Sequence, residues 1–162
     1  MNKLHIPPLD EQAAKAALEH QKILAKPPLA LGKLEPVAIR IAGMTGNPAP
    51  RLKDKAIVLF AADHHIADHG LSLTSTDVTY IQTRNFLQGG GTINAFTRNA
   101  GARLSVVDVG VNYDFGDLPG LVKRKVMHGA NDFSRGPAMT REQALKCLQV
   151  GIDMALSLIH IS

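Results

Sequence analysis

The chain has 162 residues, 45% apolar and 20% charged, and these ordinary globular values exclude a wholly disordered protein. Its 14 glycines and 9 prolines follow no period, which excludes collagen-like and low-complexity sequence. The formal net charge is +4, but the densest basic run, Lys123-Arg124-Lys125, has no interleaved aromatic residues. The run therefore favours a solvated strand edge over a nucleic-acid interface.

The cysteine content and the apolar runs indicate the compartment. Cys147 is the single cysteine, so no intrachain disulfide can form, and no activating base lies near it in the sequence. A buried, inert thiol is therefore expected. No apolar run is long enough for a signal peptide or a transmembrane helix. We expect a cytoplasmic protein with no membrane partner.

The first fifty residues predict two helices. Asp10 suits the N-cap of a helix over 10–26, which Pro27-Pro28 should end. Apolar residues at helical spacing predict a second helix over 35–42. Residues 43–50 are loop by composition.

The next segment predicts a buried strand followed by a helix. Residues 56–62 are continuously apolar, which is typical of a parallel strand, and the polar loop 63–72 follows. Thr74 or Ser75 should open a helix over 75–88, with Asp77 as its partner in a capping box. The inner face of this helix is expected to carry Val78, Ile81, Gln82, Asn85 and Phe86.

The second half of the chain repeats the alternation. Gly89-Gly90-Gly91 precedes a short helix over 92–99, a strand over 104–110 and a more polar strand over 121–126. Thr140 and Gln143 form a capping box that opens a last helix. The inner face of that helix is expected to carry Leu145, Leu148, Ile152, Ala155 and Ile159.

This order of elements predicts an α/β fold with a mostly parallel sheet flanked by helices. Because parallel crossovers are right-handed, both middle helices should lie on one face of the sheet. Two convincing strands are few for such a fold, so the sequence looks truncated. We predict an N-terminal helical segment at 1–50, a partial α/β domain at 51–156 and a tail at 157–162 that resembles translated adaptor sequence.

Polar residues follow the first predicted strand, at the end where open α/β sheets bind ligands. Asp63-His64-His65 and Asp68-His69 place two carboxylates and three imidazoles within seven residues. Such a group could hold a divalent metal, contact a substrate or simply organise the loop. The residues alone do not decide among these three hypotheses.

Three further residues are candidates for ligand contacts. Gln82 lies on an apolar stripe, and its amide needs a partner, either a planar heterocycle or a backbone group. Asp108 lies near the end of the second strong strand. Asn131 belongs to a loop that enters the last helix, which suits an anion or plain capping equally. Gly89-Gly90-Gly91 lacks the lysine of a P-loop and favours a tight turn between helices.

Five segments occur in the order in which one enzyme family has them, from about Leu18 to Ala155. They resemble the family's KPPGSLGRLE, FAxDHG, VTxxMxxNFLxGG, VVDVGV and GPAMT motifs, and they lie at 26–35, 60–70, 78–90, 106–111 and 136–140. The family that these motifs resemble is nicotinate-nucleotide–dimethylbenzimidazole phosphoribosyltransferase.

The resemblance implies a Rossmann-like α/β fold with a smaller helical domain, to which residues 1–50 would belong, and a homodimer in the full-length enzyme. It implies transfer of phosphoribose from nicotinate mononucleotide to 5,6-dimethylbenzimidazole, which gives α-ribazole 5′-phosphate and nicotinate in cobalamin nucleotide-loop synthesis. The implied partners are small molecules, without nucleic acid, membrane, metal or cofactor.

Residue by residue, Gln82 falls on a family position that lines the benzimidazole pocket, and Thr74 falls on a second, variable pocket position. Further substrate contacts are expected at Asp63, His64, Asp108 and Asn131. The family's glutamate base and its GxGNTT-type nucleotide loop would lie beyond Ser162. No catalytic residue is therefore expected here, and the chain alone should be nearly inactive.

The chain departs from the family motifs at three places. Leu29-Ala30 replaces Gly-Ser, His65 replaces the glycine after Asp-His, and Ser75 replaces the usual proline. The geometry of the loop after Asp63 is therefore open.

Two alternatives remain. Asp-His-His is also the triplet of DHH-type phosphoesterases, two-metal hydrolases that need further aspartates on earlier strands. Only Asp10 and Asp54 precede Asp63, and neither ends a predicted strand. A non-catalytic binding fragment is the other alternative.

Overall fold

The chain divides into two units, Asn2–Lys53 and Asp54–Ser162, in the computed structural model. The structure describes residues 5–71, 73–75 and 77–159. In the order of the chain, the elements are α1 (Glu11–Ile23), α2 (Leu34–Thr45), β1 (Lys55–Ala62), the 3-10 helix η1 (His65–His69), α3 (Val78–Leu87), α4 (Thr92–Asn99), β2 (Ala102–Gly110), β3 (Leu121–Lys123) and α5 (Arg141–Ile159).

The first unit is a pair of packed helices. Asp10 caps α1 as predicted, since its Oδ1 accepts from the Ala13 amide at 2.9 Å. The predicted end of α1 is wrong by three residues, because the backbone is already extended at Leu24. The predicted loop from residue 43 is also wrong, because α2 continues to Thr45. Gly43 lies where α1 begins: its carbonyl accepts from the Asp10 amide at 2.8 Å, and a Cβ would lie 3.3 Å from the Asp10 carbonyl oxygen.

The second unit is built on a parallel sheet in the order β1-β2-β3. Leu59 pairs with Val106, and Val106 pairs with Leu121, so the middle strand is β2. The third predicted strand is confirmed but ends at Lys123 instead of residue 126. Beyond Lys123 the chain still bonds to β2, since the Arg124 amide donates to the Asp108 carbonyl at 2.9 Å.

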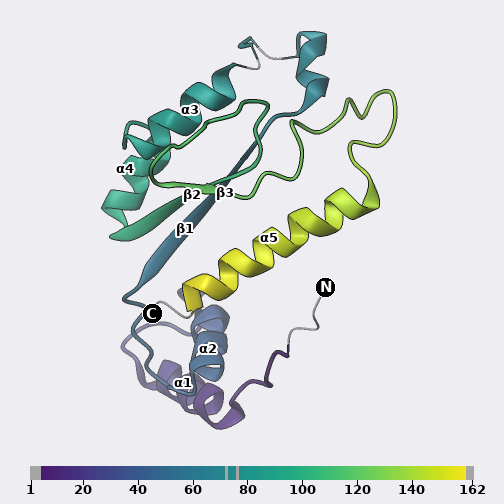
Figure 1. Ribbon diagram of the computed structural model, residues 1–162. Coiled ribbons are helices and arrows are strands. Elements are labelled where there is room, and N and C mark those ends of the chain that lie inside the picture. The colour runs from purple at the N-terminus through teal and green to yellow at the C-terminus, as the bar shows by residue number, and fades with distance from the viewer. Residues whose placement is uncertain (1–4, 72, 76, 160–162) are drawn as a thin grey trace. The chain divides into compact units, whose positions relative to one another are not determined.

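Helices cover both faces of the sheet (Figure 1). On the face of α3 and α4, Ala61, Val106, Val111, Phe115 and Leu121 form a buried cluster. On the face of α5, Val107 packs with Val150 and Met154. The predicted α/β fold, with both middle helices on one face, is therefore confirmed. No described helix is long and apolar enough to cross a membrane.

Helix α3 differs from the prediction in its start and in its inner face. It begins at Val78 instead of residue 75, and the Asp77 side chain makes no capping hydrogen bond, so the predicted capping box is wrong. Thr83 is fully buried, whereas Ile81 is 51% exposed and Gln82 is exposed too. The helix is rotated relative to the predicted stripe because it directs the large side chain of Tyr80 into the core.

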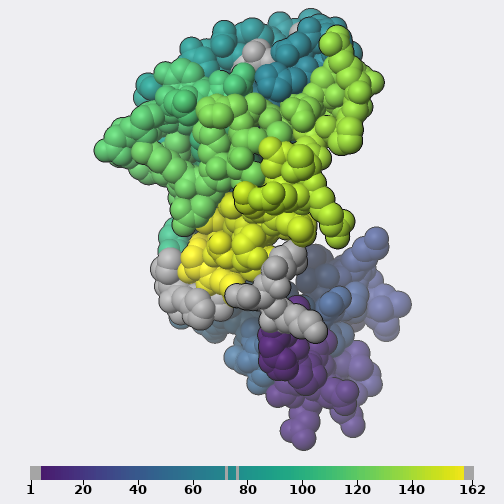
Figure 2. Space-filling view, turned by 45° about the vertical axis from the view of Figure 1, so that its right-hand side comes forward, coloured from purple at the N-terminus to yellow at the C-terminus, as the bar shows by residue number. Residues whose placement is uncertain are grey.

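Helix α5 begins as predicted but faces the sheet with other residues. The Thr140 amide donates to Gln143 Oε1 at 2.8 Å, and the Gln143 amide donates to Thr140 Oγ1 at 3.2 Å, which confirms the capping box. The predicted inner residues Leu145 and Leu148 are 40% and 57% exposed, and Met154 is buried instead. Figure 2 shows α5, in yellow-green and yellow, running along the surface of this unit. The predicted Ile159 side chain and the last three residues lie outside the described part.

Candidate functional site

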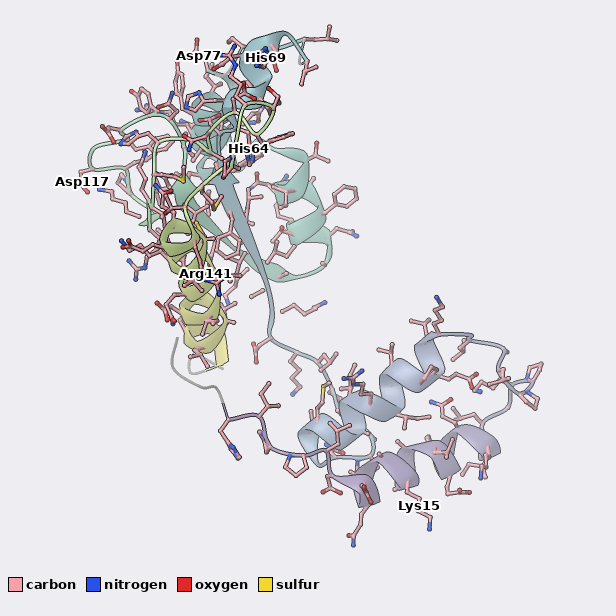
Figure 3. The ribbon with its side chains drawn as sticks, turned by 90° about the vertical axis from the view of Figure 1, so that its right-hand side faces the viewer. Lys15, His64, His69, Asp77, Asp117 and Arg141 are labelled. Atoms are coloured by element: carbon pink, nitrogen blue, oxygen red, sulfur yellow. The ribbon has the colours of Figure 1, made fainter. Side chains whose placement is uncertain are left out.

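The candidate site lies where β1 and β2 end. The chain that follows β1 forms η1, and the chain that follows β2 loops past residue 111 before it returns as β3. A third segment, which runs to α5, meets the first through an isolated bridge between His64 and Ala130. In Figure 3, His64 lies just beyond the end of β1. The structure therefore brings Asp63, His64, Asp108 and Asn131 to one end of the sheet, where ligands of α/β folds bind.

Asp63 ties these segments together. Its side chain is buried, and Oδ2 accepts from the Asn112 amide at 2.7 Å. Its backbone amide donates to the Gly110 carbonyl, and its carbonyl accepts from the Ala130 amide at 2.8 Å. Asp63 is therefore hydrogen-bonded both to the end of β2 and to the segment that runs to α5, which accounts for a loop-organising role.

Asp108 holds the same loop from the other side. The side chain is buried, and Oδ1 accepts from the Val111 amide at 2.9 Å. Lys125 Nζ lies 3.3 Å from Asp108 Oδ2 and donates to the carbonyls of Val111 and Tyr113 at 2.5 Å each. The interpretation of this basic run as a solvated edge is therefore wrong for Lys125, whose side chain is only 20% exposed. Lys123 does lie in solvent, at 51% exposed.

His65 and His69 have different surroundings. His65 Nδ1 lies 3.1 Å from Asp68 Oδ2, and its Nε2 lies 3.3 Å from the His128 carbonyl. His69 Nε2 lies 2.7 Å from Asp132 Oδ2. Within the described ranges, no three His, Cys, Asp or Glu side chains lie together so that they could hold a metal ion.

Asp132 was not among the site residues predicted from the sequence. Oδ1 accepts from the Ser134 amide and hydroxyl at 2.9 and 2.6 Å, and Arg135 Nε lies 3.1 Å from Oδ2. The hydrogen bond from His69 makes the largest contribution, and those from Ser134 a smaller one, to holding the pKa of Asp132 well below its ordinary value. The Asp-x-Ser spacing signals this turn locally, but the contact with His69 spans 63 residues and leaves no local signal.

A pocket of about 230 Å³ lies between β1 and α3. Gln82 and the two threonines of this helix face contribute polar groups to a mostly apolar lining: Leu59, Phe60, Ala61, Ala62, Val78, Thr79, Gln82, Thr83 and Phe86. Gln82 Oε1 accepts from Asn85 Nδ2 at 3.2 Å. The predicted burial of this amide is thus wrong, but the structure does place Gln82 at a pocket, which we call the α3 pocket. Thr74 lies exposed before α3 and does not line the pocket.

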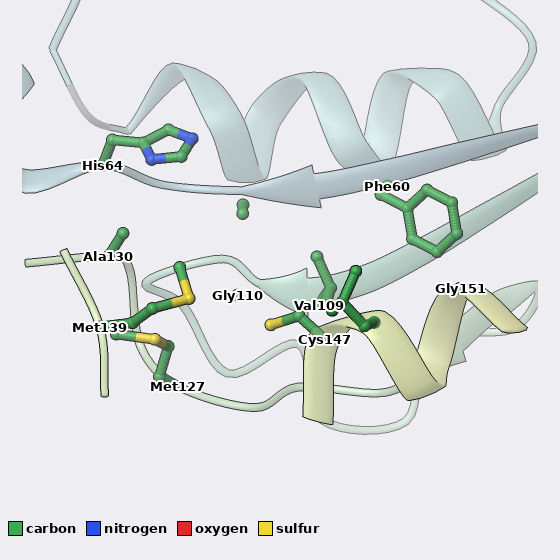
Figure 4. Close-up of a pocket in the computed structure, with 11 residues that line it drawn as sticks. Phe60, His64, Val109, Gly110, Met127, Ala130, Met139, Cys147 and Gly151 are labelled. Atoms are coloured by element: carbon green, nitrogen blue, oxygen red, sulfur yellow. The ribbon is translucent and has the colours of Figure 1, made fainter. Parts of the chain in front are cut away.

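A second pocket, of about 330 Å³, lies on the other face of β1, between the sheet and α5. His64 lies at one end and Phe60 at the other (Figure 4), and the lining is apolar: Phe60, Ala62, His64, Val109, Gly110, Met127, Ala130, Met139, Cys147, Leu148 and Gly151. Cys147 is half-buried and lines this pocket, so the predicted burial of its thiol is only partial. Asn131 is exposed and follows Ala130, which lines this pocket, and its backbone N–H donates to the Ala138 carbonyl at 2.7 Å.

Among the described residues, no glutamate lines the α3 pocket. Glu35 lies in the first unit, where its Oε1 accepts from Lys26 Nζ at 2.6 Å and from the Leu31 amide at 3.2 Å. The hydrogen bond from Lys26 lowers the pKa of Glu35 despite its burial. Glu19 and Glu142 form ion pairs with lysines of their own helices.

Comparison with known proteins gives a consistent picture. The model of a phosphoribosyltransferase family matches residues 6–161. The chain is 48% identical over 151 residues to the nicotinate-nucleotide–dimethylbenzimidazole phosphoribosyltransferase of Chloroflexus aggregans, and 46% identical over 148 residues to that of Geobacter sulfurreducens. The match covers 93% and 91% of this chain but 43% and 42% of those relatives.

A solved structure is also similar. The crystal structure of CobT from Thermus thermophilus superimposes with a TM-score of 0.85 at 40% identity, over 93% of this chain and 45% of that one. The chain thus spans less than half the length of the relatives that it matches.

Proposed function

Because the chain belongs to the phosphoribosyltransferase family, we propose that the protein that contains it transfers phosphoribose from nicotinate mononucleotide to 5,6-dimethylbenzimidazole. The products are α-ribazole 5′-phosphate and nicotinate, and the reaction serves cobalamin nucleotide-loop synthesis. Within the described residues, the feature that carries this proposal is the α3 pocket, a mostly apolar hollow with the Gln82 amide at its wall.

The pocket suits the acceptor base. A neutral planar heterocycle is held mainly by apolar contacts, and one or two polar groups fix its orientation. Phe86 and Val78 supply apolar surface, while Gln82 has both a carbonyl acceptor and an amide donor for the two ring nitrogens. Its exposed position means that a ligand reaches the amide without a rearrangement of α3.

The chemistry needs groups beyond this pocket. The acceptor nitrogen forms a bond to the ribose anomeric carbon as the bond from that carbon to the nicotinate nitrogen breaks, and the leaving pair neutralises the pyridinium. The other benzimidazole nitrogen then has to lose its proton to a base. No described glutamate of this chain lines the α3 pocket, and we assign no catalytic residue here. The glutamate base that the family motifs imply would then belong to another part of the enzyme.

The other site residues take supporting roles in this proposal. His64 and Asn131, both exposed at the carboxyl end of the sheet, are available to a substrate, whereas Asp63 and Asp108 act through the loop that they hold. Thr74 does not line the α3 pocket, and we propose it as a second contact of the acceptor only because it matches a variable pocket position of the family. We further propose that the enzyme is a cytoplasmic homodimer whose partners are small molecules, without nucleic acid, metal or cofactor.

The test is a steady-state assay of the full-length enzyme with both substrates, in which product is separated by chromatography. Gln82→Leu should raise the KM for dimethylbenzimidazole about tenfold and leave the KM for nicotinate mononucleotide nearly unchanged, because one oriented hydrogen bond is lost. Gln88→Leu, at the exposed C-cap of the same helix, is the matched control and should change neither.

Equal rises in both KM values, together with a lower melting temperature, would show that Gln82 is structural. No ribazole product from the wild-type enzyme would refute the proposed reaction itself.

A further inference from the structure

The ammonium group of Lys125 lies close to two backbone carbonyls and two carboxylates. Its Nζ donates to the carbonyls of Val111 and Tyr113 at 2.5 Å, and it lies 3.3 Å from Asp108 Oδ2 and 3.7 Å from Asp114 Oδ1. The side chain is 20% exposed and that of Asp108 is 4% exposed. Two of the three hydrogens of the ammonium are thus donated to backbone carbonyls of one loop, and the buried Asp108 carboxylate forms an ion pair with it.

That loop reaches α3 through aromatic rings. The Tyr113 ring stacks on the Tyr80 ring, with centroids 4.5 Å apart and planes at 16°, and it meets the Phe115 ring edge-on at 5.2 Å. Tyr80 belongs to the first turn of α3 and packs on the buried cluster of that face. Such ring contacts add to the burial energy and prefer a defined geometry.

The α3 pocket lies on another side of the same helix turn. Val78, Thr79 and Gln82 line the pocket, and they flank Tyr80 in the sequence. A change in the axial rotation or position of this turn therefore moves the groups that line the pocket. The ammonium, the loop and the stacked rings form one continuous path to Gln82.

We propose that Lys125 is a positioning residue of the acceptor site: its ammonium clamps loop 111–113, and the Tyr113–Tyr80 stack transmits this constraint to the turn of α3 that carries Gln82. The assignment to an acceptor site rests on the proposed function, whereas the clamp rests on the contacts alone. Lys125 is not among the residues that line the α3 pocket and acts only through the loop.

The clamp is tested on this chain by its tyrosine signal. The sequence holds two tyrosines and no tryptophan, so the tyrosine band in near-ultraviolet circular dichroism arises from the stacked pair. Lys125→Met, which keeps the aliphatic stem, should remove most of that band and leave the far-ultraviolet spectrum unchanged. The matched control is Lys123→Met, an exposed lysine paired to the exposed Asp117, and it should keep the band.

The acceptor role is tested in the full-length enzyme. Lys125→Met should raise the KM for dimethylbenzimidazole about tenfold, with kcat and the KM for nicotinate mononucleotide within about twofold of wild type. Tyr113→Ala, at a partly exposed position, should reproduce this rise. Because both changes break the same path, the double variant should show no more than the larger single effect.

Each failure has its own meaning. An unchanged tyrosine band in a folded Lys125→Met chain would overturn the clamp. Equal rises in both KM values, or additive effects in the double variant, would overturn the positioning role. If Lys125→Met does not fold, Tyr113→Ala decides the question, because an unchanged KM for the acceptor in that variant overturns the proposal. A wild-type enzyme without transferase activity would refute the proposed function, while the tyrosine band would still decide the clamp.

Discussion

Leu29 provides a quantitative test of backbone strain in the first unit. Its φ is +61°, and among the described non-glycine residues it alone has a positive φ. It stands where the family motif has glycine, and its side chain is 75% exposed. A side chain in the left-handed region costs about 1–2 kcal/mol, because Cβ crowds the following carbonyl oxygen. Leu29 therefore carries strain that little burial offsets.

The strain is isolated by a comparison of glycine with alanine at this position. Leu29→Gly removes the strain of about 1–2 kcal/mol but gives the unfolded chain extra entropy worth about 0.4–1 kcal/mol. We therefore expect Leu29→Gly to be more stable than Leu29→Ala by about 0.8 kcal/mol, the difference between the middles of these two ranges. Both variants lose the same exposed side chain, so packing cancels in the difference.

The control is the same pair of substitutions at Leu31, which is 50% exposed and has no positive φ. There glycine should be less stable than alanine by about 0.7 kcal/mol, since only the entropy term remains. The free energies of unfolding come from urea titrations followed by the helical circular dichroism signal. If glycine is also the less stable residue at position 29, the strain argument is refuted.

Three further predictions concern the second unit. In urea titrations, Val150→Ala should lower the free energy of unfolding by about 2 kcal/mol and Leu148→Ala by less than about 1 kcal/mol, because Val150 is buried on α5 and Leu148 is 57% exposed. Equal losses of unfolding free energy would contradict this orientation of the helix. The pKa of Asp132 is lowered in the folded chain, so the contribution of this carboxylate to stability is fully present above the ordinary aspartate pKa and is lost as the pH falls through the lower folded pKa. The NMR resonance of the Ser134 backbone amide should therefore keep its chemical shift down to about pH 4. Asp132→Asn should change that chemical shift at every pH. Elemental analysis should find no stoichiometric manganese or zinc, and one ion per chain that is lost in the double variant Asp63→Ala/His64→Ala would support the phosphoesterase alternative.

The sequence was sufficient for the order and type of the main elements because their signals are local. The apolar run at 56–62, the Asp10 cap and the Thr140–Gln143 capping box each depend on a few adjacent residues, and all three are present in the structure. Helix boundaries were less predictable. The extension of α2 through Gly43 depends on the close approach of α1, which a local composition rule does not contain.

Helix faces were the least predictable feature of the fold. In α3 and α5 the apolar residues occupy more than one stripe, so helical spacing alone allows two orientations. The structure buries Thr83 instead of Ile81, and Met154 instead of Leu148. Contacts with the sheet and with the loop after β2 select the orientation, as the stack of Tyr80 on Tyr113 illustrates.

At the candidate site, the position of polar residues was predictable, but the use of each carboxylate was not. A strand followed by an aspartate indicates an acid at the ligand-binding end of the sheet, and Asp63 is there. The Asp63 carboxylate nevertheless accepts a hydrogen bond from the backbone N–H of Asn112. The Asp108 carboxylate accepts one from the backbone N–H of Val111, the residue before Asn112. Both acids thus satisfy backbone donors of a single turn, and the Val111 amide would otherwise be buried without a partner.

This arrangement separates the residues that shape the site from those that can meet a ligand. Asp63, Asp108 and Lys125 hold the turn at 111–113 from three different segments, so a substitution at any one of them acts on a ligand through the backbone. Gln82 and His64 are instead exposed and line pockets on opposite faces of β1. Direct effects on substrate affinity should therefore arise at exposed side chains such as these two, whereas the buried acids should affect affinity only as far as they move the turn.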